Sequence, residues 1–198
     1  MNQATPAGWS AEAARLLEPS IGYALGVAMA VTPDLLSRPT PCRAWDLRML
    51  LRHACESLTV LAEGIQTGRV DLDPAAEDAD LAADPARAFR DRAWQLRAAW
   101  TGPRHQRQII EIAGCPLAAG LMAAAAALEV AVHGWDISRA CGQRQPIPPA
   151  LATDLLMMAP VLVPRTGRYP LFAAPVTVPA SASPGDRLAA FLGRTPPG

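Results

Sequence analysis

An apolar repeat with helical spacing recurs along almost the whole chain, and it limits the accessible folds more than any other feature. Apolar residues three and four positions apart share one face of an α-helix. Such stripes run over 14–31, 47–61 and 86–100, and further helical stretches cover 116–140, 151–162 and 183–191. The pattern predicts an all-α protein, built as an antiparallel helical bundle with a wrapping C-terminal segment.

Several residues are suited to the ends of these helices. Ser10, Asp46 and Asp84 each precede a stripe, and their side-chain oxygens can accept a free backbone N–H at the N-cap position. Pro85 then fits the first helical position after Asp84. Pro19 lies inside the first stripe, where we expect it to kink the helix.

Proline-rich, acidic or irregular segments separate the stripes. We expect connections over 32–42 and 71–84, while 104–112 fits either a short strand or a loop. Pro116 is expected to open the fourth long helix. The sequence has no repeat and no second boundary, so we predict one domain over 1–198, with its core at about 9–165 and the C-terminal segment at about 166–198.

The composition excludes several classes of protein. With 51% hydrophobic residues, the chain is not expected to be disordered. Its 18 Lys and Arg balance 18 Asp and Glu, which argues against a nucleic-acid partner and against a polybasic membrane-binding surface. All 18 of these basic residues are Arg, so Schiff-base chemistry, which needs a Lys amine, is excluded. The Arg, Ala and Pro usage is typical of actinobacterial genes.

Cysteine spacing and hydropathy give expectations about compartment. The four cysteines contain no Cys-x-x-Cys pair, so neither a cysteine zinc site nor a disulfide framework is expected. The N-terminus lacks the basic stretch and apolar core of a signal peptide. The uncharged run over 112–128 is slightly short for a membrane span and contains Pro116. We therefore expect a soluble, cytoplasmic protein without a membrane partner.

Two histidines and one glutamate form the group of residues best suited to chemistry. Glu129 and His133 are four residues apart, which on a helix places their Cβ atoms roughly 5–6 Å apart on one face. A charged Glu beside the most apolar stretch of the chain is costly unless it is paired or bound to a metal. His53, on the second helix, is the natural third ligand, because neighbouring helices of a bundle can direct side chains to one interior point.

Three N and O ligands would leave a position open on the metal, as in catalytic zinc sites. Zinc is therefore the expected cation, and nickel or iron would suit the same ligands. The spacing also fits structural roles. Glu129 could pair with an arginine, and His53 could be a core histidine with satisfied hydrogen bonds.

Two stretches resemble signatures of the mycothiol-dependent maleylpyruvate isomerase metal-binding family, within the DinB-like metalloenzyme superfamily. They are RPTPCRAWDLRMLLRH over 38–53 and LEVAVHGWDISRACG over 128–142. The tail APVTVPASASPGDRLAAFLGRTP over 174–196 is similar to the end of one actinobacterial subfamily, most of whose members have no assigned substrate. The resemblance covers about 9–197.

This resemblance implies a DinB-like four-helix bundle with a metal held by His, Glu and His, which correspond to His53, Glu129 and His133. The family's isomerases add a C-terminal domain, and too few residues follow the predicted bundle here to form one. The resemblance is therefore specific for the family and leaves the maleylpyruvate reaction itself open. It does imply mycothiol as a cosubstrate.

Residues near the expected site have both functional and structural interpretations. Asp136, three after His133, could orient a ligand or a nearby arginine; capping or surface pairing fits equally well. Trp135 fits packing better than substrate stacking, and Arg139 points elsewhere on the helix. Cys42 fits a packed loop residue better than a nucleophile. His105 lies among Gly, Pro and Arg residues and is expected to be solvated.

Three functions remain open at this point. The first is a metal-dependent enzyme acting on a small electrophilic substrate with a low-molecular-weight thiol, as an isomerase or S-transferase. The second is a thiol-independent isomerase, cyclase or hydrolase of a specialised pathway. The third is a non-catalytic binding module stabilised by its metal. The stripes contain no heptad seam, so no particular oligomeric state is predicted.

Overall fold

A computed structural model describes residues 15–42, 45–70, 79–101, 109–164, 166–168 and 172–196. Helices dominate this part of the chain, and a small three-stranded sheet accompanies them. The predicted all-α class is therefore confirmed. No helix within the described residues is long and apolar enough to cross a membrane.

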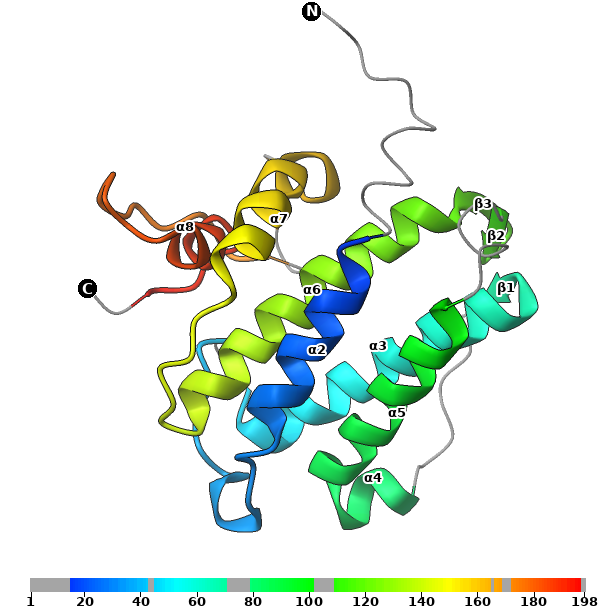
Figure 1. Cartoon of the computed structure of the whole chain (residues 1–198), viewed down its shortest axis with the longest axis horizontal. Coiled ribbons are helices and arrows are strands. Elements are labelled where there is room, and N and C mark those ends of the chain that lie inside the picture. Colours follow the sequence, from blue (N-terminus) through cyan, green and yellow to red (C-terminus); the bar gives the residue numbers. More distant parts are fainter. Residues whose placement is uncertain are drawn as a thin grey trace, which may run out of the picture.

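Four long helices form the bundle: α2 (Leu17–Ala28), α3 (Leu47–Thr67), α5 (Pro85–Trp100) and α6 (Ala119–Ala140). Helix α2 packs against α6 and α5, and α3 packs against the same two helices from the other side (Figure 1). The colours of Figure 1 show that α3 and α5 run in one direction, opposite to α2 and α6. The pairs α2–α5 and α3–α6 are therefore antiparallel, and α6 faces α3 along the side that carries the expected site.

The apolar stripes supply the core as expected. The stripe on α3 is buried at each predicted position, namely Leu47, Leu50, Leu51, Ala54, Leu58 and Leu61. Helix α6 is buried on nearly all sides, because α2, α3 and α7 (Pro149–Leu162) all pack against it. Burial on this scale provides the main stabilisation of the fold.

The predicted N-caps at Asp46 and Asp84 are confirmed, and Ser183 caps the last helix in the same way. At Asp46, Asp84 and Ser183 the side-chain oxygen accepts the backbone N–H three residues later. The expected cap at Ser10 lies outside the described residues. Helix α2 begins at Leu17, which places Pro19 in its first turn. The predicted kink there is wrong, because a proline in the first turn removes only an N–H that has no partner within the helix.

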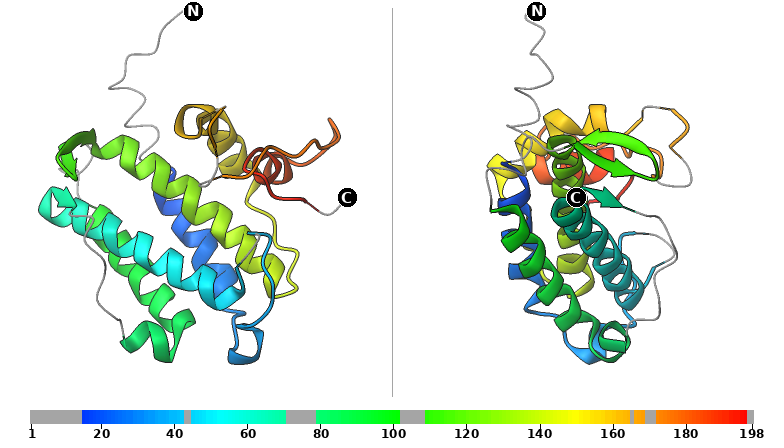
Figure 2. Two further views of the ribbon diagram at one scale, coloured as in Figure 1. Left: turned by 180° about the vertical axis from the view of Figure 1, so that it is seen from behind. Right: turned by 90° about the vertical axis from the view of Figure 1, so that its right-hand side faces the viewer.

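A small sheet at one end of the bundle contains the short strand that was one of the two alternatives for 104–112, together with two strands that the sequence did not predict. Strand β1 (Arg69–Val70) pairs in parallel with β2 (Ile109–Ile112), which pairs antiparallel with β3 (Cys115–Ala118). A two-residue turn at 113–114, with positive φ at both residues, joins β2 to β3. Helix α6 therefore begins at Ala119 and not at Pro116. The sheet sits where α3 ends and α6 begins (Figure 2).

Within the described residues, three further α-helices lie outside the four-helix bundle, and the sequence predicted two of them. The short helix α4 (Ala79–Ala83) lies inside the predicted loop 71–84. Helix α7 and helix α8 (Pro184–Phe191) match the predicted fifth and last helices, and both lie on the α6 side of the bundle (Figures 1 and 2). Residues 192–196, which end the C-terminal segment, follow α8, and the Arg194 side chain contacts Asp136 on α6.

Gly134 permits the close approach of α2 to α6. A Cβ atom at this position would lie 3.0 Å from Tyr23 Cε1 and 3.2 Å from Ala24 Cα. We expect Gly134→Ala to lower the free energy of unfolding by about 1–3 kcal/mol, as overpacking does. Gly26→Ala, where nothing lies within 4 Å, should raise it by about 0.5–1 kcal/mol. Urea denaturation of both variants checks this, and equal effects would contradict it.

Tyr23 makes stability sensitive to alkaline pH. Its hydroxyl donates to the carbonyl of Gln145 at 3.0 Å, and burial raises its pKa well above the ordinary value. Since the unfolded chain ionises this phenol near pH 10 and the folded chain does not, stability should fall as the pH rises above about 10. Urea denaturation between pH 8 and 11 should show a smaller decrease for Tyr23→Phe. The same decrease in both proteins would contradict the prediction.

Candidate metal centre

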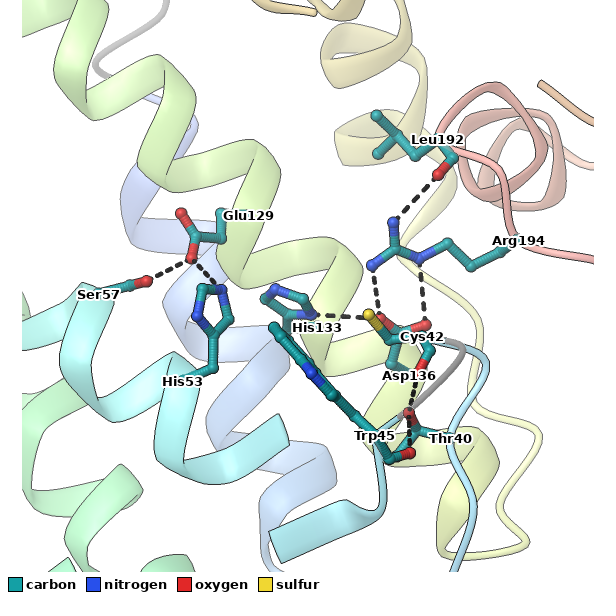
Figure 3. A network of polar contacts seen from close by, with 10 residues as sticks. All are labelled: Thr40, Cys42, Trp45, His53, Ser57, Glu129, His133, Asp136, Leu192 and Arg194. Atoms are coloured by element: carbon teal, nitrogen blue, oxygen red, sulfur yellow. Dashed lines mark hydrogen bonds and ion pairs between the residues drawn. The ribbon is translucent and has the colours of Figure 1, made fainter. Parts of the chain in front are cut away.

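Two antiparallel helices bring His53, Glu129 and His133 together. The Asp46 cap fixes the start of α3, so that His53 lies two turns into the helix on the side of α6. Glu129 and His133 lie one turn apart on α6, and Figure 3 shows both directed towards His53. The group that spacing and resemblance singled out is therefore assembled in space.

The three side chains are close enough to share one ion. His53 Nε2 lies 3.2 Å from Glu129 Oε1, and the two imidazole rings are 5.2 Å apart between centroids. One donor atom from each of the three residues lies within 4.8 Å of the others. Donor atoms that each lie about 2.1 Å from a tetrahedral zinc are about 3.4 Å apart. Side-chain movements of about 1.4 Å or less would therefore bring the three donor atoms to the spacing that zinc requires.

The donor chemistry also suits a divalent cation. Two imidazoles and one carboxylate are the ligand types of catalytic zinc sites, and nickel and iron accept the same set. The side chains of His53 and Glu129 retain 38% and 35% of their exposure, whereas His133 retains 10%. One side of the group therefore faces solvent, where a water molecule or a small substrate could reach an ion.

Glu129 carries a negative charge at neutral pH. Burial acts to raise its pKa, but the hydrogen bond from His53, the charge of His133 and the hydrogen bond from Ser57 together lower it below the ordinary value. Ser57 Oγ donates to Glu129 Oε1 at 2.5 Å. Sequence reasoning missed Ser57, although it stands four residues after His53 and hence on the same face of α3.

Asp136 holds the far side of the His133 ring. Its side chain is fully buried and lies 3.2 Å from His133 Nδ1. Arg194 donates to both carboxylate oxygens, from Nη2 at 2.8 Å and from Nε at 3.4 Å (Figure 3). Asp136 thus contacts both a candidate ligand and an arginine, and full burial excludes surface pairing. Burial acts to raise the pKa of Asp136, but His133 and Arg194 more than offset it and keep the carboxylate ionised.

Trp45 covers one side of the histidines. Its ring centroid lies 4.7 Å from that of His53 and 6.4 Å from that of His133. The hydroxyl of Thr40 donates to the Trp45 carbonyl at 2.9 Å and fixes the backbone before α3. Trp45 directly precedes the Asp46 cap, and this position in the sequence is the signal that would have placed it beside the first turns of α3.

The other residues considered from the sequence are not part of this group. Trp135 is buried, and the Arg139 guanidinium lies 4.9 Å from the centre of its ring, so both pack together. Cys42 is half-buried, and burial raises the pKa of its thiol, which disfavours a nucleophile. His105 lies outside the described residues.

We expect Ser57→Ala to weaken metal binding without unfolding the chain. The hydroxyl supports a candidate ligand, and losing such a support costs about 10–100-fold in metal affinity. Competition for Zn²⁺ with a chromophoric chelator measures the change. Thr153→Ala, which removes an exposed hydroxyl that donates to the Pro149 carbonyl of its own helix, is the matched control. An unchanged Kd in Ser57→Ala would count against the role of Ser57.

Comparisons with known proteins identify the family of the chain. The family model described as the mycothiol maleylpyruvate isomerase N-terminal domain matches residues 17–138, which include all three candidate ligands. Uncharacterised proteins from two strains of Mycobacterium tuberculosis, CDC 1551 and H37Rv, are each 29% identical to this chain over 170 residues. The alignment covers 83% of this chain and 88% of each relative. No solved structure matches the chain significantly.

Proposed function

The chain belongs to the mycothiol maleylpyruvate isomerase N-terminal domain family, and we propose that it is a metal-dependent enzyme acting on a small electrophilic substrate. The proposed cosubstrate is a low-molecular-weight thiol, with mycothiol the first choice, and the proposed reaction is isomerisation or S-transfer. The observation that carries the proposal is the convergence of His53, Glu129 and His133 from two helices, with two of the three still open to solvent.

The residues of the chain have distinct parts in this proposal. His53, Glu129 and His133 would hold the cation. An ionised Asp136 can accept a hydrogen bond but cannot donate one. The hydrogen of His133 therefore belongs on Nδ1, where it is donated to Asp136, and the lone pair on Nε2 is left for the ion. Trp45 would border the substrate beside His53. When bound, the cation, zinc first and nickel or iron as alternatives, lowers the pKa of a thiol so that thiolate forms near neutral pH.

The chemistry needs no further reactant. The thiolate sulfur forms a bond to the β-carbon of a conjugated alkene, and the π electron pair moves onto the neighbouring carbonyl. The former double bond can then rotate, after which the carbon–sulfur bond breaks, the alkene reforms in its other geometry and the thiolate is released. In the S-transfer version a proton, equivalent to the one lost by the thiol, adds to the α-carbon and the thioether is the product.

Thiol binding can be tested without knowing the substrate. Co²⁺-loaded protein is titrated with mycothiol, and a sulfur-to-cobalt charge-transfer band in the near ultraviolet is expected. Glu129→Gln should lose the band together with the metal, whereas Glu56→Gln, an exposed acid paired with Arg52, should keep both. Absence of the band in the Co²⁺-loaded wild type would overturn the thiol-dependent function.

Activity assays then separate the alternatives. Zn²⁺-loaded protein is assayed with mycothiol and either maleylpyruvate or 1-chloro-2,4-dinitrobenzene. Turnover that requires both metal and thiol supports the proposal. Metal-dependent turnover that added thiol does not change would favour a thiol-independent enzyme. A melting temperature that falls strongly on chelation, without turnover or thiol binding, would favour a metal-stabilised binding module.

A further inference from the structure

Arg194 follows α8 in the sequence, and its guanidinium group is buried inside the protein. It is buried, with Nε and Nη2 donating to Asp136 and Nη1 donating to the carbonyl of Leu192 at 3.1 Å. All three nitrogens therefore have protein partners. A guanidinium held in this way is poorly placed to bind an anionic substrate, and its contacts point to a role inside the chain.

The contacts of Arg194 lead directly to a candidate metal ligand. Asp136 lies between the guanidinium and His133, with Oδ2 shared between Arg194 Nη2 and His133 Nδ1. The opposite ring nitrogen of His133 faces His53 and Glu129 (Figure 3). Because a ring held at Nδ1 has a fixed orientation, the direction of Nε2 depends on where Asp136 stands.

The segment that carries Arg194 is itself anchored. Gly193 adopts φ 84°, and a Cβ atom there would lie 2.6 Å from the Cβ of Ala173. Arg168 donates to the carbonyls of Phe191 at 2.6 Å and Ala173 at 3.0 Å. The N–H of Arg194 also bonds to the carbonyl of Ala189 at 2.9 Å. The guanidinium is thus presented to Asp136 from a fixed backbone.

We propose that Arg194 is a positioning residue for the metal site: it fixes Asp136, which orients His133, and so couples the C-terminal segment to metal binding. This inference rests on the proposed role of His133 as a ligand. Coupling of this kind is reciprocal. Loss of the Arg194 contact should weaken metal binding, and metal binding should strengthen the docking of the segment.

The test compares Arg194→Gln and Arg194→Lys with the wild type. Lysine keeps the charge but lacks the planar fork that spans both carboxylate oxygens. Both variants should bind Zn²⁺ about 10–100-fold more weakly, as expected when the partner of a ligand is disturbed. Their Co²⁺ complexes should also show a shifted visible spectrum, which reports ligand geometry. Arg187→Gln, which removes an exposed charge from α8, should behave as wild type.

The outcomes are separable. A folded Arg194→Lys protein with the wild-type Kd and Co²⁺ spectrum would overturn the inference, even if Arg194→Gln fails to fold. Wild type that binds no metal would overturn the inference and the proposed function together. Wild type that binds Zn²⁺ without binding thiol would affect only the proposed function, and the Arg194 variants would still decide the inference.

Hydrogen exchange gives a second readout that needs no activity. Zn²⁺ should slow amide exchange at Leu192, Gly193 and Arg194 in the wild type, because these N–H groups bond within the docked segment. The same addition should have no effect on these amides in His53→Ala. Equal exchange with and without bound Zn²⁺ in the wild type would contradict the reciprocal coupling.

Discussion

Asp136→Ala is expected to lower the free energy of unfolding by about 3–5 kcal/mol, the usual cost of removing one partner of a buried ion pair. The substitution leaves the buried Arg194 guanidinium without its counter-charge and His133 Nδ1 without its acceptor. Urea denaturation at neutral pH with a chelator present measures the loss and separates it from any effect of metal.

Two further variants make this prediction specific. Asp154→Ala removes an exposed acid from α7 and should change stability by less than about 0.5 kcal/mol. Adding Arg194→Met to Asp136→Ala removes the stranded charge, and the pair should recover part of the lost stability. A loss below about 1 kcal/mol in Asp136→Ala would mean that the buried pair contributes as little as a surface one.

Zn²⁺ at 100 times its Kd is expected to raise the free energy of unfolding of the wild type by about 2.7 kcal/mol, because it binds only the folded chain. In Glu129→Gln the same Zn²⁺ concentration should give almost no increase, since the carboxylate that balances the ion is lost. Denaturation curves with and without Zn²⁺ provide the comparison.

The control for this prediction is another glutamate. Glu56→Gln removes an exposed carboxylate on α3 that pairs with Arg52, and it should keep the full increase with Zn²⁺. If Glu129→Gln gained as much stability as the wild type, the ion would bind elsewhere and the assignment of Glu129 would be wrong.

The long helices could be predicted from the sequence because each buries a continuous apolar stripe. The periodicity over 47–61 and 86–100 and the caps at Asp46 and Asp84 are local signals, and helices α3 and α5 follow them closely. The β2–β3 hairpin was harder to predict, because its strands are short and its turn at 113–114 lacks the usual Asn-Gly signal. A proline before a long apolar run is typical of the first position of a helix, but Pro116 lies in β3.

Some residues of the candidate site could likewise be predicted from the sequence, and others could not. Glu129 and His133 could be paired from their spacing on one helix. The bundle architecture pointed to His53 on a neighbouring helix, and the resemblance implied the same three residues. Arg194 lies 58 residues from Asp136 in the sequence, so no periodicity links them and only the folded chain brings them together. The parts that depend on local spacing were predictable, whereas those that depend on the return of the C-terminal segment were not.

Elemental analysis of the purified protein tests the central claim most directly. The account predicts one divalent metal ion per chain in the wild type and none in His53→Ala, with helical circular dichroism unchanged. His105→Ala, which alters the remaining histidine of the chain, should keep the metal. A His53→Ala protein that retains a full equivalent of metal, or a wild type that takes up none when Zn²⁺, Ni²⁺ or Fe²⁺ is supplied, would contradict the account.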